Sequence, residues 1–206
     1  MNKKSEMAQG GKSLIVVVSA PSGSGKTTIV SRLLEKAPDM KRSVSCTTRQ
    51  PREGEKTGID YIFVSEEEFK ERIEKRDFLE WEKIFSNYYG TPRDQVTEAI
   101  EQGVDIILSI DIRGARSIKG EFPESVGVFI MPPSFEELET RIKRRDADRG
   151  KQVSIRLQES GREIAAADEY DYLIINDDLD RAVEELKTII EAEKDNRKRN
   201  IKKDKE

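Results

Sequence analysis

Short runs of consecutive apolar, mostly β-branched residues recur along this chain at wide intervals. They cover residues 13–18, 104–108, 126–130 and 172–175. Short runs that are mostly apolar are typical of strands buried on both faces, whereas strands with one solvated face alternate apolar and polar residues. The pattern therefore predicts a parallel sheet whose strands come from both halves of the chain.

Helical periodicity fills most of the sequence between these runs. The expected helices cover residues 27–36, 94–102, 134–145, 154–167 and 179–193. Strands that alternate with helices predict an α/β fold, in which helices cover both faces of the parallel sheet and form three layers.

Two regions interrupt this alternation. Residues 43–89 carry short strand signals and one charged helix over residues 66–76, which predicts an inserted subdomain of mixed α+β structure. Residues 141–156 are rich in arginine and aspartate and contain no apolar run, which predicts a mobile flap. Both ends of the chain, residues 1–12 and 194–206, are polar and rich in charge, so we expect disordered or frayed tails.

Composition excludes several classes of function. The chain has a single cysteine, Cys46, and no histidine, so it cannot build an internal disulfide, a Cys/His zinc site or a Ser-His-Asp triad. A net charge of -4 offers no general attraction to nucleic acid or to an anionic membrane, and we expect neither as a partner. No leader pattern and no apolar stretch near the ~20 residues that span a bilayer are found, so we expect a cytoplasmic protein.

The first apolar run leads into a glycine-rich loop and then into a helix. This loop nearly matches G-x-x-x-x-G-K-[ST], with Ala20 at the first glycine position. Glycines let backbone N–H groups turn toward a phosphate, and the helix N-terminus adds a positive dipole. The sequence predicts that ATP is bound by Ala20, Pro21, Ser22, Gly23, Ser24, Gly25, Lys26, Thr27 and Thr28.

Two residues of this loop have more specific expected roles. Lys26 would reach the β- and γ-phosphates, and the Thr27 hydroxyl would ligate Mg²⁺. A glycine-serine turn with a chance lysine is the competing interpretation. The agreement of strand, loop and helix disfavours it.

The insert combines cationic, phenolic and acidic residues in a second group of motifs. They read Ser-Cys-Thr-Thr-Arg-Gln-Pro-Arg at 45–52, Gly-Ile-Asp-Tyr at 58–61, Phe-Leu-Glu-Trp at 78–81 and Asn-Tyr-Tyr-Gly-Thr at 87–91. In order and spacing, they and the P-loop resemble the guanylate kinase family from about residue 14 to about residue 193. The resemblance implies a P-loop kinase core, an inserted nucleoside-monophosphate-binding subdomain and a helical lid. It further implies a kinase that transfers the γ-phosphoryl group of ATP to GMP.

The same resemblance implies roles for individual residues. Those that would bind the phosphate of GMP are Arg49, Arg52, Tyr61 and Tyr89, and those around its base are Ser45, Glu80 and Thr91. Guanidinium forks and phenol hydroxyls make a suitable anion clamp. A carboxylate such as Glu80 accepts from the guanine N2 edge, and Ser45 can donate to O6. Adenine would leave that carboxylate unpaired, so we expect AMP to be rejected. Taken one at a time, the two arginines would also fit a solvated charge pair in a loop, and the tyrosines would fit core packing. We assign the neighbouring Trp81 to the core.

In the second half of the chain, the family usually places two acidic residues at the end of an apolar strand. This chain has Asp111, expected on the substrate side, but Ser109 at the other position. The lid arginines of the family correspond to Arg141, Arg145 and Arg156, which with Lys26 and Arg49 would neutralise charge during phosphoryl transfer.

Two further segments bear on the ATP site. In the lid, Arg144 and Asp146 occupy positions where glycine is common in the family, so we expect a stiffer lid. Asn176 lies where the family has its adenine loop, although a helix N-cap fits as well.

The expected organisation is a guanylate-kinase-like domain over residues 13–193. Its core would span residues 13–42 and 92–193, its GMP-binding insert about 43–91 and its lid about 141–156. A non-catalytic binding module and a kinase for AMP or a sugar phosphate are alternatives. The intact P-loop and lid arginines disfavour the first, and the paired Ser45 and Glu80 disfavour the second. The sequence does not determine the oligomeric state and is compatible with a homo-oligomer.

Overall fold

Five parallel strands form the central sheet, in the order β2-β7-β1-β8-β9. The computed structural model describes residues 13–84, 86–145 and 150–203. The strands of this sheet are β1 (Ile15–Ser19), β2 (Lys41–Arg42), β7 (Ile106–Ser109), β8 (Val126–Met131) and β9 (Tyr172–Ile175). Four of them match the apolar runs, and the parallel pairing confirms the predicted fold class. The two-residue β2 has no pattern of its own and was not predicted.

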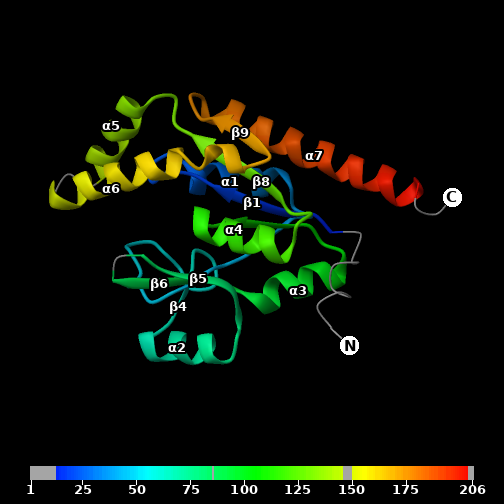
Figure 1. Ribbon diagram of the computed structural model, residues 1–206, viewed down its shortest axis with the longest axis horizontal. Helices are drawn as coiled ribbons and strands as arrows, with labels where there is room; N and C mark the ends of the chain where they lie inside the picture. Colours follow the sequence, from blue (N-terminus) through cyan, green and yellow to red (C-terminus); the bar gives the residue numbers. More distant parts are fainter. Residues whose placement is uncertain (1–12, 85, 146–149, 204–206) are drawn as a thin grey trace.

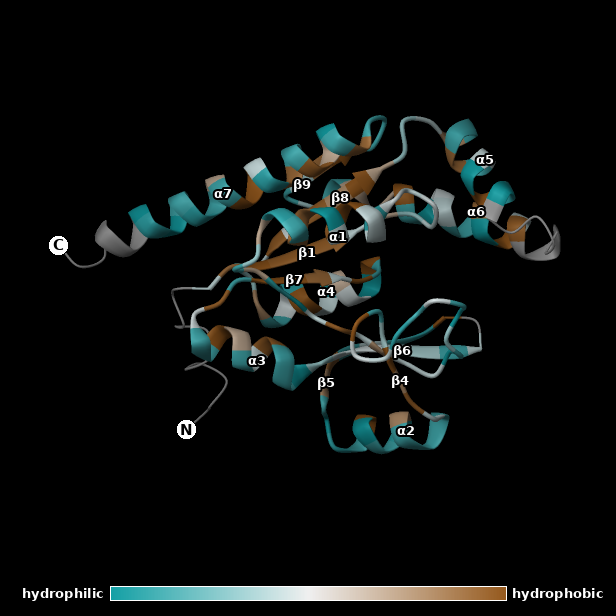
Figure 2. Ribbon diagram, turned by 180° about the vertical axis from the view of Figure 1, so that it is seen from behind, coloured by the Kyte–Doolittle hydropathy of each residue, from teal (hydrophilic) through white to brown (hydrophobic). Residues whose placement is uncertain are grey.

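Helices cover both faces of this sheet (Figure 1). One face packs on α1 (Lys26–Lys36) and α7 (Leu179–Lys203), and the other packs on α3 (Arg93–Gln102) and α4 (Ile112–Glu121). Alternate residues of β1 divide between the two cores, with Val16 on the α1 side and Val17 on the α4 side. Figure 2 shows the resulting contrast between hydrophobic strands and the hydrophilic outer faces of the helices. Three layers are therefore present, as predicted.

A second sheet lies below the first in Figure 1 and contains strands between Cys46 and Pro92. Its order is β4-β3-β6-β5, with β3 and β4 parallel and the other pairs antiparallel. Its elements are β3 (Cys46–Thr47), β4 (Ile62–Phe63), β5 (Phe78–Ile84), β6 (Asn87–Pro92) and the helix α2 (Glu66–Glu74).

Aromatic packing holds α2 against the second sheet. The buried rings of Phe69 and Phe78 stack with centroids 4.5 Å apart. Gly90 lies under them, and a Cβ atom there would come within 3.0 Å of both rings. Trp81, which we assigned to the core, is instead 44% exposed: it lies opposite Gly90 at the margin of this aromatic cluster, where its ring contacts Tyr88 with centroids 6.0 Å apart.

The region predicted as a flap is largely helical. Helix α5 (Phe135–Arg145) ends inside it, and α6 (Gly150–Ile164) begins before the predicted start at Ser154. Residues 146–149 lie outside the described part of the chain. A short 3₁₀ helix, η2 (Ala167–Glu169), leads from α6 toward β9.

The expectation of a frayed C-terminal segment after residue 193 is wrong for its described part. Helix α7 continues to Lys203, and its side chains contact the body of the protein. The Arg197 guanidinium donates to the carbonyl oxygens of Ser13, at 2.8 Å, and Glu124, while the Lys194 ammonium pairs with Asp105 at 2.6 Å. These contacts stabilise a segment that has little apolar surface. Residues 1–12 and 204–206 lie outside the described residues.

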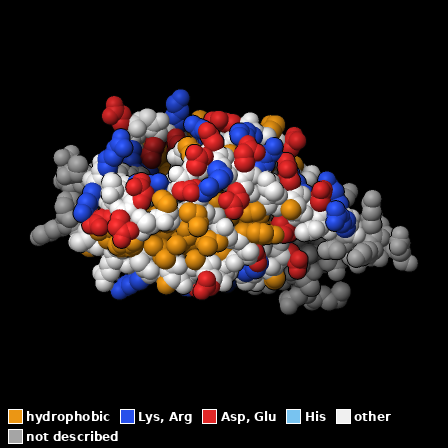
Figure 3. All heavy atoms as spheres, turned by 90° about the horizontal axis from the view of Figure 1, so that it is seen from above, with side chains coloured by type: hydrophobic (Ala, Val, Ile, Leu, Met, Phe, Trp, Pro, Cys, Tyr) orange, Lys and Arg blue, Asp and Glu red, His pale blue; other side chains and the backbone are white. Residues whose placement is uncertain are grey.

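Strand β9 forms one edge of the central sheet. Its Leu173 and Ile175 side chains are about half exposed. On the face seen from above, hydrophobic side chains form a band among charged ones (Figure 3).

No helix of the described residues is long and apolar enough to cross a membrane.

Candidate active site

The P-loop joins β1 to α1 in the geometry that its sequence predicts. Gly23 and Gly25 adopt positive φ angles of 94° and 90°, which side chains rarely allow. Gly25 is the N-cap of α1, and no side chain caps this helix end. The backbone N–H groups of the first turn therefore remain available to an anion. Thr27 and Thr28, at the start of α1, are exposed.

Lys26 extends from the start of α1 along the end of the neighbouring strand. Its ammonium donates a 2.7 Å hydrogen bond to the carbonyl oxygen of Ile110. Burial lowers the pKa of Lys26 to about 8, although the carboxylates of Asp111 and Glu163 act in the opposite direction. An anion bound at the P-loop would favour the charged form and raise this pKa.

Two residues distant in sequence brace the loop. The Asn176 side-chain amide donates a buried 2.7 Å hydrogen bond to the carbonyl oxygen of Ser24. From α6, a carboxylate oxygen of Glu163 accepts from the Ser22 backbone N–H at 3.3 Å. Burial raises the pKa of Glu163, while the Ser22 bond and the charge of Lys26 oppose the rise. Asn176 thus supports the predicted ATP loop through the backbone.

The predicted phosphate clamp is assembled on the second sheet. Arg49 forms a bidentate ion pair with Glu55, with both nitrogen–oxygen distances at 2.9 Å. The guanidinium carbon lies 5.3 Å from the ring centroid of Tyr61, which itself meets Tyr89 edge-on at 6.1 Å. Glu55 also accepts from the Arg52 backbone N–H at 2.8 Å. These contacts hold the clamp residues together before a ligand arrives.

The predicted base-recognition group lies deeper, between β5, β6 and α4. Thr91 donates a short hydrogen bond to Glu80, and Asp111 caps α4 by accepting from the Gly114 N–H at 2.8 Å. A Cβ atom at Gly114 would lie 2.8 Å from a carboxylate oxygen of Glu80, so only glycine allows this approach. Burial raises the pKa of Glu80 to about 7; the Thr91 hydrogen bond opposes this rise and the charge of Asp111 adds to it.

A cavity of about 690 Å³ connects the P-loop with the clamp. It is lined by the P-loop, by Ser45, Arg49, Arg52, Tyr61 and Tyr89, and by Ser109, Asp111, Arg141 and Arg156. Glu80 and Thr91 do not line it; Glu80 borders a separate hollow beside Trp81. The structure thus brings together residues from both halves of the predicted site, whereas Ser24 and Asn176, like Glu80 and Thr91, do not line this cavity.

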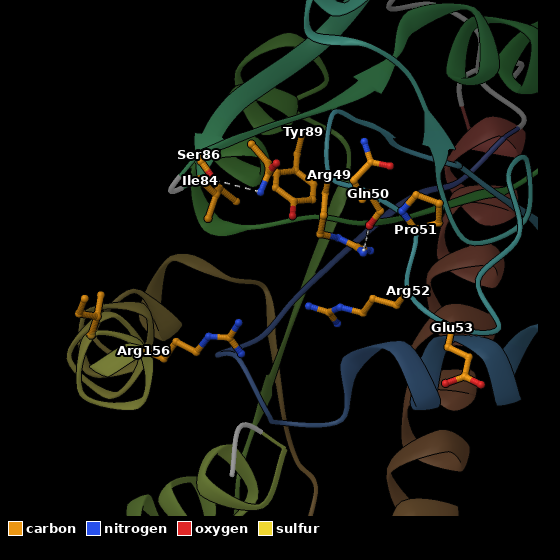
Figure 4. A pocket seen from close by; sticks show the side chains of 11 residues that line it. Arg49, Gln50, Pro51, Arg52, Glu53, Ile84, Ser86, Tyr89 and Arg156 are labelled. Atoms are coloured by element: carbon orange, nitrogen blue, oxygen red, sulfur yellow. Dashed lines mark hydrogen bonds between the residues drawn. The ribbon is translucent and has the colours of Figure 1, made fainter. Parts of the chain in front are cut away.

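Cationic side chains face one another at the mouth of the site. In Figure 4, Arg156 of α6 and Arg52 of the loop between β3 and β4 point toward each other across the cavity. Arg141 lies farther along, where it pairs with Glu137 at 2.9 Å and donates to the carbonyl oxygen of Asn176 at 3.5 Å. The Arg145 side chain and the whole of Asp146 lie outside the described residues, whereas Arg144 is exposed.

The geometry of a P-loop facing an arginine-tyrosine clamp agrees with the comparisons. A profile described as Guanylate kinase matches residues 12–193. The chain belongs to the guanylate kinase family. As a guanylate kinase it is a nucleoside monophosphate kinase, which transfers the γ-phosphoryl group of ATP to GMP and yields ADP and GDP.

Similar guanylate kinases cover nearly all of the described chain. The guanylate kinase of Caldanaerobacter subterraneus subsp. tengcongensis is 50% identical over 181 residues, which is 88% of each chain. That of Carboxydothermus hydrogenoformans is 46% identical over 89% of this chain and 90% of its own. The crystal structure of guanylate kinase from Anaplasma phagocytophilum superposes with a TM-score of 0.74, at 35% identity over 91% of this chain and 89% of that one.

Several residues of this guanylate kinase site carry no motif of their own. Glu55, Glu163 and Arg42 line the cavity, and sequence reasoning missed all three. Glu55 could have been found as an acid close to two arginines in a loop. The positions of Glu163 and Arg42 follow only from the packing of α6 and the register of β2.

Proposed function

We propose that the cavity between the P-loop and the clamp binds both substrates and that the two groups of predicted residues divide between them. The P-loop residues 20–28 and Asn176 form the ATP side. The GMP side is formed by Ser45, Arg49, Arg52, Tyr61, Glu80, Tyr89, Thr91 and Asp111. The observation that carries this proposal is that one continuous cavity is lined by Lys26 and by the whole arginine-tyrosine clamp.

Charge neutralisation is the main task of this site. Phosphoryl transfer spreads charge over the equatorial oxygens, and positioned cations stabilise it electrostatically. Lys26 would act from the P-loop, Arg49 from the acceptor side, and the lid arginines Arg141, Arg145 and Arg156 from the third side. Transfer between two phosphates requires no protein general base, which suits a chain without histidine.

Magnesium would enter with the nucleotide. The described residues contain no group of three or more acidic, cysteine or histidine side chains that could hold a metal by themselves. Mg²⁺ commonly keeps several waters and binds through one or two protein ligands plus substrate phosphates. The exposed Thr27 hydroxyl beside the P-loop fits that pattern. The metal would neutralise phosphate charge there.

Guanine would be read at the floor of the acceptor side. Glu80 is held by Thr91 and lies against the start of α4, near Asp111. Its second carboxylate oxygen can accept from guanine donors, and Ser45 can donate to O6. Glu80 does not line the cavity, and we infer that GMP binding brings its carboxylate into contact with the base.

A substrate comparison tests the assignment. The purified chain would be assayed for ADP formation with ATP·Mg²⁺ and GMP, AMP, CMP or UMP as acceptor. We expect GMP to be strongly preferred and Lys26→Ala to lose nearly all turnover while unfolding cooperatively. Glu80→Gln should lower the GMP/AMP ratio, since one mismatched buried hydrogen bond costs on the order of 1–3 kcal/mol. Normal turnover by Lys26→Ala, or an unchanged ratio for Glu80→Gln, would refute the corresponding role.

A further inference from the structure

Arg42 is a cation on the edge strand of the central sheet. It pairs in register with Ile107 of β7, whose side chain lies in the core on the α1 side. Neighbouring residues in parallel register point to the same face of a sheet. The Arg42 side chain therefore leaves β2 toward the face covered by the P-loop helix, and it is half-buried there.

The side chain of Arg42 has no ion-pair partner in the described part of the chain. Its Nε atom is buried without a hydrogen-bond partner, and no described carboxylate forms an ion pair with it. Other arginines of the site differ, since Arg49 is paired with Glu55 and Arg141 with Glu137. Buried charges are normally paired, because an unpaired one forfeits its hydration.

Arg42 lies between the two halves of the active site. It lines the same cavity as Lys26 on one side and Ser45 and Tyr61 on the other. Its charge acts on both sides, because it lowers the pKa of Lys26 and also that of Tyr61, each alongside larger effects of burial.

We propose that Arg42 is a further substrate-binding residue, which contacts nucleotide phosphate oxygens at the point where ATP and GMP meet. A phosphate would pair with this half-buried guanidinium, which has no ion-pair partner among the described residues, and the planar fork suits two phosphate oxygens at once. This inference rests on the division of the cavity proposed above.

A substrate-binding role and a structural role predict opposite changes in stability. If Arg42 served the fold, its removal would destabilise the protein without ligands. If its partner is a phosphate, replacing Arg42 by an apolar side chain of similar length removes a half-buried charge that forms no ion pair with the described residues. The unliganded protein then keeps or gains stability while it loses affinity for nucleotides.

Three variants separate these possibilities. Arg42→Met retains the apolar stem without the charge, and Arg42→Lys retains the charge without the fork. Lys41→Met is the matched control, because Lys41 is the exposed neighbour on the same strand and pairs with Gln102 and Glu98 outside the cavity. For each, the measurements are the thermal midpoint without ligand, GMP affinity by calorimetry, and kcat/KM for GMP at saturating ATP·Mg²⁺.

For Arg42→Met we expect GMP affinity and kcat/KM to fall by on the order of tenfold or more, with no loss of thermal midpoint. Arg42→Lys should recover part of the loss, and Lys41→Met should match the wild type. Wild-type kinetics in Arg42→Met, or equal losses in both Arg42 variants, would overturn the inference. Failure of the wild type to phosphorylate GMP would instead refute the underlying function, so the two failures are distinguishable.

Discussion

The side-chain amide of Asn176 donates a buried 2.7 Å hydrogen bond to the carbonyl oxygen of Ser24, which lies 152 positions earlier in the chain. The bond ties the loop after β9 to the middle of the P-loop. It also fixes the space beside Gly25, where a Cβ atom would lie 2.4 Å from the Asn176 nitrogen. Any side chain at Gly25 must therefore displace this amide.

The Gly25→Ala variant tests this contact. Alanine at φ +90° costs about 1–2 kcal/mol in backbone strain, and the overlap with Asn176 adds a further cost of about 1–3 kcal/mol. Gly58→Ala is the control, because Gly58 has a φ of +78° and open space around its Cβ position. We expect Gly25→Ala to unfold at a lower denaturant concentration than Gly58→Ala and to raise the KM for ATP. Equal midpoints would contradict the role of Asn176.

Lys26 should couple ATP binding to proton uptake. Its pKa is about 8 without ligand, because burial disfavours the charged ammonium. ATP phosphates favour that charge, so binding between about pH 8 and 9 should take up protons. Calorimetry in buffers of different ionisation enthalpy measures this uptake, which Lys26→Met should abolish. Lys36→Met, on the exposed side of α1, should retain it. Binding without any uptake in the wild type would argue against phosphate contact at Lys26.

The same shift predicts how stability depends on pH. The unfolded lysine titrates near 10.5 and the folded one near 8, so the unfolded chain binds more protons between these values. The contribution of Lys26 therefore makes the unliganded protein more stable as pH rises through this window. Urea unfolding of wild type and Lys26→Met should show the difference.

Glu80 should make GMP binding sensitive to mild acid. Burial raises its pKa to about 7, and only the ionised carboxylate accepts from both guanine donors. At pH 6 about a tenth of it remains ionised, so the KM for GMP should rise by about tenfold relative to pH 8. Glu80→Gln should show a higher KM that changes little between these pH values. A wild-type KM that is constant from pH 6 to 8 would rule out this reading of Glu80.

Raising the pH should decrease the contribution of Glu80 to folding stability, although it increases the affinity for GMP. Its folded pKa lies above the unfolded value of 4.5, so the folded state binds more protons between pH 4.5 and about 7. The contribution of Glu80 to stability is present below this window and is lost as pH rises through it. Glu80 therefore contributes least to the stability of the unliganded protein at the pH values where its ionised carboxylate binds GMP best.

Ligand-dependent closure is expected in two separate segments. Arg52 and Arg156 point toward each other across the cavity, and a phosphate bound between them would hold the two segments together (Figure 4). We expect GMP alone to increase hydrogen-exchange protection in residues 43–91, and ATP·Mg²⁺ alone to do so in residues 141–156. Strand β7 is the internal control, because it is largely buried and pairs with β1 along its whole length. Complete protection of both segments without ligand, or protection of only the lid by GMP, would contradict this assignment.

Most of the central sheet was predictable because β1, β7, β8 and β9 consist of apolar runs that carry their own signal. The same holds for the P-loop, whose glycines and lysine are adjacent in sequence. By contrast, β2 is only two residues long and exists through its pairing with β7. Helix α7 extends past its apolar periodicity because Arg197 reaches carbonyl groups in two other loops. Such contacts depend on distant residues and leave no local pattern.

The residues of the site likewise include some that motifs predict and others that they do not. The clamp residues Arg49 and Tyr61 lie in recognisable motifs, and the structure places both in the cavity. The partner of Arg49 is Glu55, and the carboxylate against the P-loop is Glu163, which comes from a helix more than half the chain away. Charge balance in a cavity depends on three-dimensional proximity, so sequence spacing could not supply it.

The position of β1 at the centre of the parallel sheet has a consequence for the order in which the protein can fold during synthesis. Its neighbours are β7 and β8. One edge of β1 can pair only after Ile107 has been synthesised, and the other only after Val126. The antiparallel β5 and β6, joined by a short turn, can pair as soon as both have been made. Contacts between distant residues are slow to form, because the intervening loop must first be closed. A growing chain can therefore complete the second sheet before the central sheet, which supports the P-loop, has formed.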